Sequence, residues 1–334
     1  MKIAVLIRDQ EHISLRIYRD SILRELVRLG IQLSPFSGHE KPSPVCDLVW
    51  DPGLGMRKIP SLFRWNDRRP LVATVHGIRA FSLPAGELAP TWQERLNLFF
   101  IKRALISDWT WFSRKVAAVI TVSNFGAAEL RAAFPVPIQK LHVIHHGLDH
   151  SVFTVTDAAQ NCGEPYFLTV SRYQPIKNVD RLFSAYAGLK GTDLPKLVAI
   201  MPDYRPKKTC PGITVIHEML SQKELAPWYR GAVAAVFPSL RESFGMPILE
   251  AMACGCPVIT SNSTGCAEVA GDAALLVDPR SVNAIAAAME RLIEDREMRN
   301  SLREKGIARA REFTWSRSAH EHLKVFKQVL GESG

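Results

Sequence analysis

Two carboxylates, Glu242 and Glu250, are separated by seven residues where a helix is expected to begin. Glu242 belongs to a polar loop, and Glu250 lies about two helical turns further along the chain. Pro247, between them, favours a helix start, because proline is common at the first helical position. The free N–H groups and the dipole of a helix start suit a phosphate. A phosphate site flanked by two carboxylates that bind hydroxyl groups fits a nucleotide sugar.

A strand, a loop, a helix and a second strand are needed to hold these residues. Residues 232–237 are apolar, short and uninterrupted, which predicts a buried parallel strand. Residues 248–254 are predicted to form the helix, which Gly255 ends, and residues 258–260 the next strand. Ligands of open α/β sheets bind where such strands end, so the pattern favours a ligand site at the loop, residues 239–245.

This stretch resembles the retaining glycosyltransferases of family 4, which have the GT-B fold. Their motif of two glutamates separated by seven residues is matched by Glu242 and Glu250, and the likeness continues through residues 250–259 and 268–274. It extends from about residue 165 to the C-terminus and is weak before about residue 71. The resemblance implies an α/β chain of two Rossmann-like parallel-sheet domains that face a cleft, with the acceptor in the first and the donor in the second.

The resemblance also implies roles for residues around the two glutamates. Arg172 and Lys177 bracket a loop between a predicted strand and a predicted helix, where on sequence alone they are either solvated charges or anion ligands. In relatives, an Arg and a Lys there bind the donor diphosphate. The ribose hydroxyls would fall to Glu250 and the sugar hydroxyls to Glu242. Backbone groups would assist, from Leu220 at the nucleobase and from Ser243, Phe244, Gly245 and Met246 beside the sugar and phosphate.

His76 is the candidate site residue of the first domain. It follows a predicted strand, at the end where α/β sites form. It is either a structural histidine or a residue near the transferred sugar, and the resemblance implies the second, because many relatives have a histidine there. The loop before the first helix lacks the paired glycines of many relatives. Arg8, Asp9 or His12 would then contact ligand, although a solvated loop is the simpler interpretation.

Metal chemistry has two candidates: Cys254 with Cys256, which could also serve redox chemistry, and a run of four histidines. The run consists of His142, His145, His146 and His150. It resembles the interdomain turn of the family, with His146 where many relatives have Asn, and we do not expect it to bind a metal. No Asp-x-Asp motif occurs, so side-chain cations are expected to neutralise the diphosphate, with no metal and no other cofactor.

The reaction that these residues imply is retaining hexosyl transfer from a nucleotide-diphospho sugar, with a UDP- or GDP-sugar as donor. The bond from the anomeric carbon to the diphosphate breaks, and cations stabilise the charge on the leaving phosphate. The acceptor would be a glycan or a lipid-linked sugar of cell-envelope polysaccharide synthesis. Alternatives on the same fold are an epimerase, a phosphorylase and a non-catalytic binding protein. The predicted catalytic residues are His76, Arg172, Lys177 and Glu242.

The length of 334 residues favours two domains, and strand candidates alternate with helices throughout. We place the first domain at residues 1–155 and the second at residues 156–315. A last helix, residues 316–330, is expected to pack back on the first domain. The other predicted strands cover residues 3–7, 48–50, 71–75, 116–122, 143–144, 166–170, 197–200 and 213–216. The other predicted helices cover residues 14–29, 92–115, 221–230, 281–292 and 295–311. Two more are predicted, one capped by Ser123 and one capped by Asn178 that runs to residue 189.

Charge and cysteine content limit the partners and the compartment. The net charge is +9, and residues 1–155 carry 20 Lys and Arg against 13 Asp and Glu. An anionic membrane or a phosphorylated acceptor would explain this excess, whereas no nucleic-acid motif is present and we expect no nucleic-acid partner. Six cysteines without a paired motif favour a cytoplasmic protein, and packing is the simpler role for Cys254 and Cys256.

Two stretches of the first half combine basic with aromatic residues. The first has Arg57, Lys58, Arg64, Arg68 and Arg69 with Leu62, Phe63 and Trp65, and the second has Trp92, Leu96, Phe99 and Phe100 with Arg95, Lys102 and Arg103. Such surfaces suit the headgroup region of a bilayer, which predicts peripheral attachment to an anionic membrane. The alternative is that the aromatic residues belong to the core and the cations are merely solvated.

Overall fold

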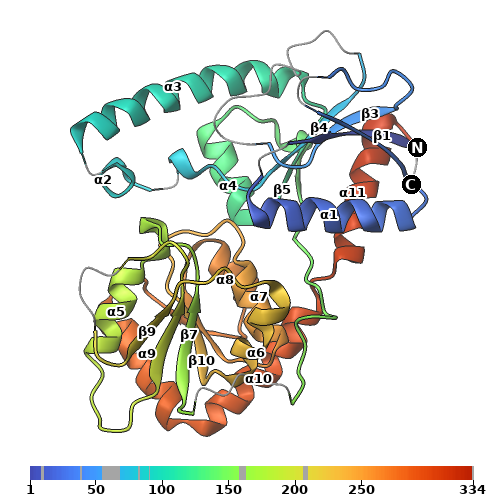
Figure 1. The fold of residues 1–334 in the computed structure, drawn as a ribbon. Coiled ribbons are helices and arrows are strands. Elements are labelled where there is room, and N and C mark those ends of the chain that lie inside the picture. Colours follow the sequence, from blue (N-terminus) through green and yellow to red (C-terminus); the bar gives the residue numbers. More distant parts are fainter. Residues whose placement is uncertain are drawn as a thin grey trace. The chain divides into compact units, whose positions relative to one another are not determined.

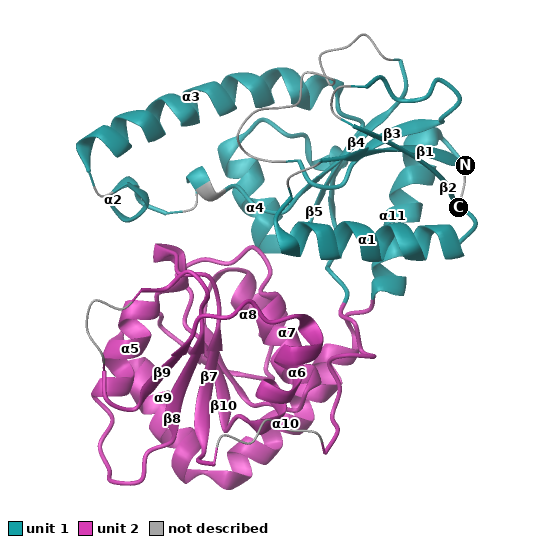
Figure 2. Ribbon diagram, viewed as in Figure 1, with its two compact units in different colours: residues 1–147, 315–334 teal, residues 148–314 magenta. Residues whose placement is uncertain are grey.

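The structure is a computed structural model that describes residues 1–8, 11–37, 40–54, 68–81, 83–89, 91–157, 163–205 and 210–332. The chain divides into two compact units (Figure 2). Unit 1 combines Met1–Gly147 with Trp315–Gly334, and unit 2 is the uninterrupted stretch Leu148–Thr314. Each unit has its own parallel sheet and its own apolar core.

Unit 1 is built on a six-stranded parallel sheet in the order β2-β1-β3-β4-β5-β6 (Figure 1). Its strands are β1 (Lys2–Ile7), β2 (Gln32–Ser37), β3 (Leu48–Asp51), β4 (Leu71–Val75), β5 (Ala118–Thr121) and β6 (Leu141–Val143). Its helices are α1 (Ile13–Arg28), α2 (Ala85–Leu88), α3 (Trp92–Lys115), α4 (Asn124–Ala133) and α11 (Trp315–Leu330). Strands β3, β4 and β5 are buried almost throughout, as parallel strands covered on both faces must be.

The sequence determines where the helices of unit 1 begin. A capping box begins α3, because the Thr91 hydroxyl accepts a hydrogen bond from the Glu94 N–H and the Glu94 carboxylate accepts one from the Thr91 N–H. Ser123 caps α4, as predicted, by accepting from the Gly126 N–H at 2.9 Å. The C-terminal half of α3 enters the core, where the Trp109 ring stacks on Phe134 at 4.8 Å between ring centres.

Unit 2 has a second six-stranded parallel sheet, in the order β12-β11-β10-β7-β8-β9. Its strands are β7 (Tyr166–Val170), β8 (Lys196–Ile200), β9 (Ile213–Ile216), β10 (Ala234–Phe237), β11 (Val258–Ser261) and β12 (Leu275–Val277). Its helices are α5 (Val179–Ala187), α6 (Gln222–Gly231), α7 (Met246–Ala253), α8 (Thr264–Ala270), α9 (Val282–Glu294) and α10 (Arg296–Arg311). The order places β7 and β10 side by side at the centre, and their C-terminal ends therefore share one edge.

The prediction of two open parallel sheets flanked by helices is confirmed. The predicted bounds of α3, β4 and β7 agree with the structure to the residue. Strand β2 was not predicted; it lies at an edge of its sheet, contains Pro35 and lacks a buried alternation. Among the helices that the structure describes, none is long and apolar enough to cross a membrane.

Two local predictions are corrected. We expected Asn178 to cap α5 with its side chain, but its backbone is left-handed, with φ at 61°. Its side-chain amide instead donates to the carbonyls of Pro238 and Pro279, at 2.8 and 2.6 Å, and so joins two loops at the strand ends. Pro247 was expected at the first position of α7, but Met246 begins the helix and Pro247 is the second residue.

Candidate active site

A pocket opens at the C-terminal ends of β7 and β10 in unit 2. Its lining includes Ser171 after β7, Lys177, Glu242, and Gly245 at the start of α7. The hydroxyl oxygen of Ser171 is buried and has no hydrogen-bond partner in the described part of the chain. This edge is where an open α/β sheet binds its ligand, so the pocket is the candidate active site.

Lys177 and Glu242 form an ion pair inside this pocket. The Lys177 ammonium contacts Oε1 of Glu242, and the two side chains are 21% and 19% exposed. The Ser239 hydroxyl lies 3.4 Å from the same carboxylate oxygen and donates to it. The pair places a cation directly beside a carboxylate, which is the combination predicted for a sugar phosphate.

The loop that carries Glu242 is held in place by the beginning of α8. The Gly265 N–H donates to the Glu242 carbonyl at 2.9 Å, and a Cβ atom on Gly265 would lie 2.5 Å from the Ser243 carbonyl oxygen. Only glycine therefore fits this position. The preceding residue, Thr264, has φ at 65°, which is rare for a β-branched residue. Such backbone conformations persist where the surrounding structure enforces them, often at functional sites.

The start of α7 offers fewer hydrogen-bond donors than the sequence suggests. Gly245 occupies the cap position with φ at 105°, a conformation that favours glycine. Pro247 has no N–H, and the Ile248 N–H donates to the Gly245 carbonyl at 3.0 Å. The positive end of the helix still faces the pocket through Gly245 and Pro247, which line it.

Glu250 lies on the second turn of α7 and is buried. Only 9% of the residue is exposed, and burial raises the pKa of its carboxyl to about 7. The Tyr229 hydroxyl of α6 donates to Oε2 of Glu250 at 2.9 Å, and this hydrogen bond opposes the rise in pKa. Tyr229 was not among the predicted site residues, because only the packing of α6 against α7 brings it to Glu250.

The other predicted donor residues lie outside the lining of the pocket. The Arg172 side chain, 48% exposed, pairs with Asp203 through Nε and Oδ2 at 2.7 Å. Leu220 is half-buried just before α6, and the buried Phe244 ring packs against Phe313 at 5.8 Å between ring centres. The structure thus brings Lys177, Glu242 and Gly245 together, but not these residues.

In unit 1, adjacent strands β1, β3 and β4 bring three polar side chains to one edge of the sheet: Arg8, Asp51 and His76. The Arg8 guanidinium binds both carboxylate oxygens of the fully buried Asp51, at 2.6 and 2.5 Å. The simpler interpretation, a solvated loop, is therefore wrong for Arg8. His12 is exposed at the start of α1, and Asp9 lies outside the described residues. A search for acids at strand ends would have found Asp51.

His76 is neutral and fixed in one orientation. Its Nε2 donates to the Pro52 carbonyl at 2.8 Å, and burial lowers its pKa to about 4. The ring stacks on His146 at 5.3 Å and meets the edge of Tyr18 at 4.5 Å. The Tyr18 hydroxyl lies 2.7 Å from Nε2 of His322, whose pKa burial lowers to about 4. The histidines thus form part of a buried cluster of rings.

The histidine run and the two neighbouring cysteines were the candidates for metal chemistry. Among the described residues, no three His, Cys, Asp or Glu side chains lie close enough to share a metal ion. Cys254 and Cys256 are free thiols buried at the junction of α7 and β11, which confirms packing as their role. Burial raises the pKa of Cys254 to about 12, so this thiol stays protonated near neutral pH.

Comparisons with known proteins agree with this architecture. The model of Glycosyltransferase Family 4 matches residues 45–152, and that of Glycosyl transferases group 1 matches residues 156–309. O-antigen chain mannosyltransferase B of Escherichia coli is 28% identical over 228 residues, which cover 63% of this chain and 60% of that protein. The MMP alpha-(1->4)-mannosyltransferase of Mycolicibacterium hassiacum is 29% identical over 281 residues, with 78% and 66% covered. This chain thus spans about two thirds or less of these relatives.

Solved structures show the same fold over the whole length. Sucrose-phosphate synthase from Thermosynechococcus elongatus superposes with a TM-score of 0.76 at 19% identity, over 99% of this chain and 100% of that one. Anabaena HepE, in complex with UDP and glucose, gives 0.71 at 16%, over 98% and 100%. The two family models, which match successive parts of the chain, show that it belongs to the glycosyltransferases of group 1 and family 4, and the solved structures show that it has a GT-B-like fold.

Proposed function

We propose that this protein transfers a hexosyl group from a nucleotide-diphospho sugar to a glycan or lipid-linked acceptor, with retention of configuration at the anomeric carbon. The observation that supports it most is the Lys177–Glu242 pair, in a pocket at the strand ends of a chain from a glycosyltransferase family. A cation for the diphosphate and a carboxylate for the sugar hydroxyls are the two groups that the donor requires.

The chemical barrier lies in breaking the bond between the anomeric carbon and the diphosphate. Negative charge then develops on the leaving phosphate, and the Lys177 ammonium stabilises it. In the structure this ammonium is bound to Glu242, so a bound donor divides the pair: phosphate takes the lysine and the sugar hydroxyls take the carboxylate. The departing phosphate assists the acceptor hydroxyl on the same face, as the family mechanism implies.

Arg172 joins the diphosphate by exchanging its partner. Its ion pair with Asp203 is about half exposed, and such surface pairs contribute only about 0 to 1 kcal/mol. The exchange of Asp203 for the diphosphate, which carries two negative charges, is therefore favourable. Glu250 binds the ribose hydroxyls, and backbone groups near Leu220 bind the nucleobase. The loop N–H groups from Ser243 to Met246 assist at the sugar. In unit 1, His76 acts near the transferred sugar as a neutral imidazole.

The names of relatives favour particular partners. The first two relatives are mannosyltransferases, one of them for O-antigen chains, which favours a mannosyl donor and polysaccharide synthesis for the cell envelope. For the nucleotide of the donor, the solved complexes of HepE with UDP support a UDP-sugar as a candidate. Free cysteines favour the cytoplasm as the compartment.

A donor screen followed by product analysis tests the proposal. Donor binding stabilises the fold by mass action, so one of the UDP-, GDP-, ADP- and dTDP-sugars should raise the melting temperature. That donor with a sugar acceptor should then yield a glycoside with the donor's anomeric configuration, as measured by NMR.

The alternatives give other products. An epimerase converts the donor alone into an isomer, and a phosphorylase yields a sugar phosphate with inorganic phosphate. A binding protein shows the thermal shift without turnover. Any of these outcomes contradicts the proposed transfer.

A further inference from the structure

Helix α3 carries apolar side chains on two opposite faces. One face is buried in the core of unit 1 through Leu105, Trp109 and Phe112, each at most 2% exposed. The other is open to solvent. Its apolar members, with their exposed fractions, are Trp92 (70%), Leu96 (49%), Phe99 (55%), Phe100 (59%) and Ile106 (43%).

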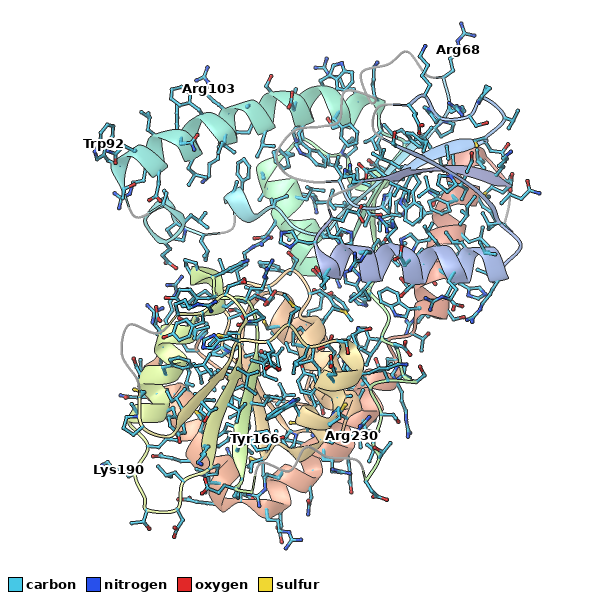
Figure 3. All side chains as sticks on the ribbon, viewed as in Figure 1. Arg68, Trp92, Arg103, Tyr166, Lys190 and Arg230 are labelled. Carbon is cyan, nitrogen blue, oxygen red and sulfur yellow. The ribbon has the colours of Figure 1, made fainter. Side chains whose placement is uncertain are left out.

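The exposed members form one continuous stripe. Positions 92, 96, 99, 103 and 106 follow each other at three- and four-residue steps, which keeps them on one side of a helix. A step of two residues rotates an α-helix by about 200°, so the buried Leu105 lies nearly opposite Arg103, which belongs to the exposed side. We call Trp92, Leu96, Phe99, Phe100, Arg103 and Ile106 the outer stripe. In Figure 3, Trp92 and Arg103 extend away from the body of unit 1.

Two of the five basic residues of α3 lie along the outer stripe. Arg103 is exposed within the outer stripe, and Arg114 continues it towards the C-terminal end of the helix. The two acidic residues of the helix lie elsewhere: the Glu94 carboxylate is bound to Thr91 in the capping box, and Asp108 is half-buried, closer to the core-facing side. The outer stripe therefore combines aromatic rings with positive charge and carries no carboxylate.

We propose that the outer stripe docks on an anionic membrane surface. Single exposed apolar residues are ordinary on a monomer, but a contiguous stripe that includes Trp and two Phe marks an interaction site. Aromatic rings and Arg side chains suit the headgroup region, where the rings enter the acyl boundary and the cations meet anionic lipid. A second copy of the chain fits less well, because a two-fold contact through the same stripe brings Arg103 towards its own copy.

The predicted membrane attachment, which the sequence assigned to two stretches of the first half, is thereby narrowed to helix α3. Most of its first stretch, residues 57–67, lies outside the described residues, and of the rest Arg68 is exposed while Arg69 donates to the backbone carbonyls of Ser43 and Pro42. In α3, the aromatic residues of the second stretch, Trp92, Phe99 and Phe100, are exposed, so the alternative that they belong to the core is wrong.

Sedimentation of the full chain with liposomes tests the docking without any donor or acceptor present. The protein should sediment with vesicles of phosphatidylglycerol and phosphatidylcholine in equal parts, not with phosphatidylcholine alone, and should be released as salt rises. Each cation near an anionic surface strengthens binding about fivefold, so Arg103→Glu with Arg114→Glu should weaken it at least about 25-fold. The apolar variant Phe99→Ser with Phe100→Ser should weaken it at least about tenfold.

Two control variants match these changes elsewhere on unit 1. Val27 and Ile138, 57% and 58% exposed, are replaced by Ser, and the exposed Arg24 and Arg28 by Glu. Both controls should sediment like the wild type, and all four variants should unfold cooperatively; the Arg24 and Arg28 control loses the surface ion pair of Arg28 with Glu25, which lowers its melting temperature slightly.

Three outcomes would overturn the docking. The first is wild-type protein that stays in the supernatant with anionic vesicles at low salt. The second is an equal loss in the Arg24 and Arg28 control, which would show that net charge alone attracts the protein. The third is that light scattering finds the wild type as a dimer and the Phe99 and Phe100 variant as a monomer, which would show that the outer stripe binds a second copy of the chain. The proposed hexosyl transfer can fail with this result unchanged, because the vesicle assay contains no donor.

Discussion

Glu250 should make nucleotide binding depend on pH near neutrality. Burial raises the pKa of this carboxyl to about 7, so it gains its charge within the working range of the protein. If the carboxylate binds the ribose hydroxyls, the protonated form loses an acceptor and binds more weakly. A group with pKa about 7 is about 9% ionised at pH 6 and about 91% at pH 8, which predicts about tenfold weaker binding at pH 6.

Calorimetry with the nucleoside diphosphate of the selected donor measures this dependence. The phosphates of the ligand also titrate, and the variant Glu250→Gln corrects for them, because it meets the same ligand without the carboxyl group. The ratio of wild-type to variant affinity should rise about tenfold from pH 6 to pH 8. A constant ratio would refute the assignment of Glu250 to the ribose.

The same shift in pKa should appear in stability. In the unfolded chain the carboxyl has a pKa near 4.5, so between pH 4.5 and 7 the folded state binds the extra proton. The free energy of unfolding should therefore fall as pH rises through this window, by about 3 kcal/mol from this residue. Glu250→Gln should lack that part of the slope. Tyr229→Phe removes a hydrogen bond that lowers the pKa of Glu250, so it should move the transition to higher pH.

Three other variants address the pocket itself. Lys177→Ala should lower turnover about 100-fold, because about 3 kcal/mol of transition-state stabilisation is lost. The control Lys190→Ala, at an exposed position, should leave turnover unchanged. Near-normal turnover in a folded Lys177→Ala variant would show that Lys177 is not part of the site. Glu242→Gln should keep nucleotide affinity within about twofold by calorimetry and reduce sugar transfer, and a loss equal to that of the ribose-site variant contradicts the assigned roles. Gly265→Ala should lower the free energy of unfolding by about 1 to 3 kcal/mol in denaturant titrations, because its Cβ would meet a backbone oxygen at 2.5 Å; unchanged stability would show that the loop relaxes freely.

Local patterns in the sequence predict most of this fold. Strand β7 is a continuous apolar run and α3 has two periodic apolar faces, so both could be recognised without tertiary information. Strand β2 could not, because its place at the sheet edge permits Pro35 and polar residues. Asn178 looked like a cap because its type is common there, but its amide is used by two loops that only the folded sheet brings near.

Site residues that follow a strand could be predicted from the sequence, whereas the contacts between separate elements could not. Lys177 and Glu242 were both expected, yet their direct ion pair follows from β7 and β10 being neighbours in the sheet. Asp51 was missed because nothing local marks it as the partner of Arg8. The hydrogen bond from Tyr229 to Glu250 depends on how α6 lies against α7, which no spacing in the sequence encodes.

The two-part make-up of unit 1 has a consequence for synthesis on the ribosome. Helix α11 supplies His322 and Phe326, whose rings lie 5.5 and 5.4 Å from that of Trp50 in the core of unit 1. These residues emerge only after the whole of unit 2, which is one uninterrupted stretch. Unit 2 can therefore complete its fold first, while the aromatic core around Trp50 stays open until α11 has been made. For that interval the nascent chain exposes apolar surface, the kind that chaperones bind, in the unit that is made first.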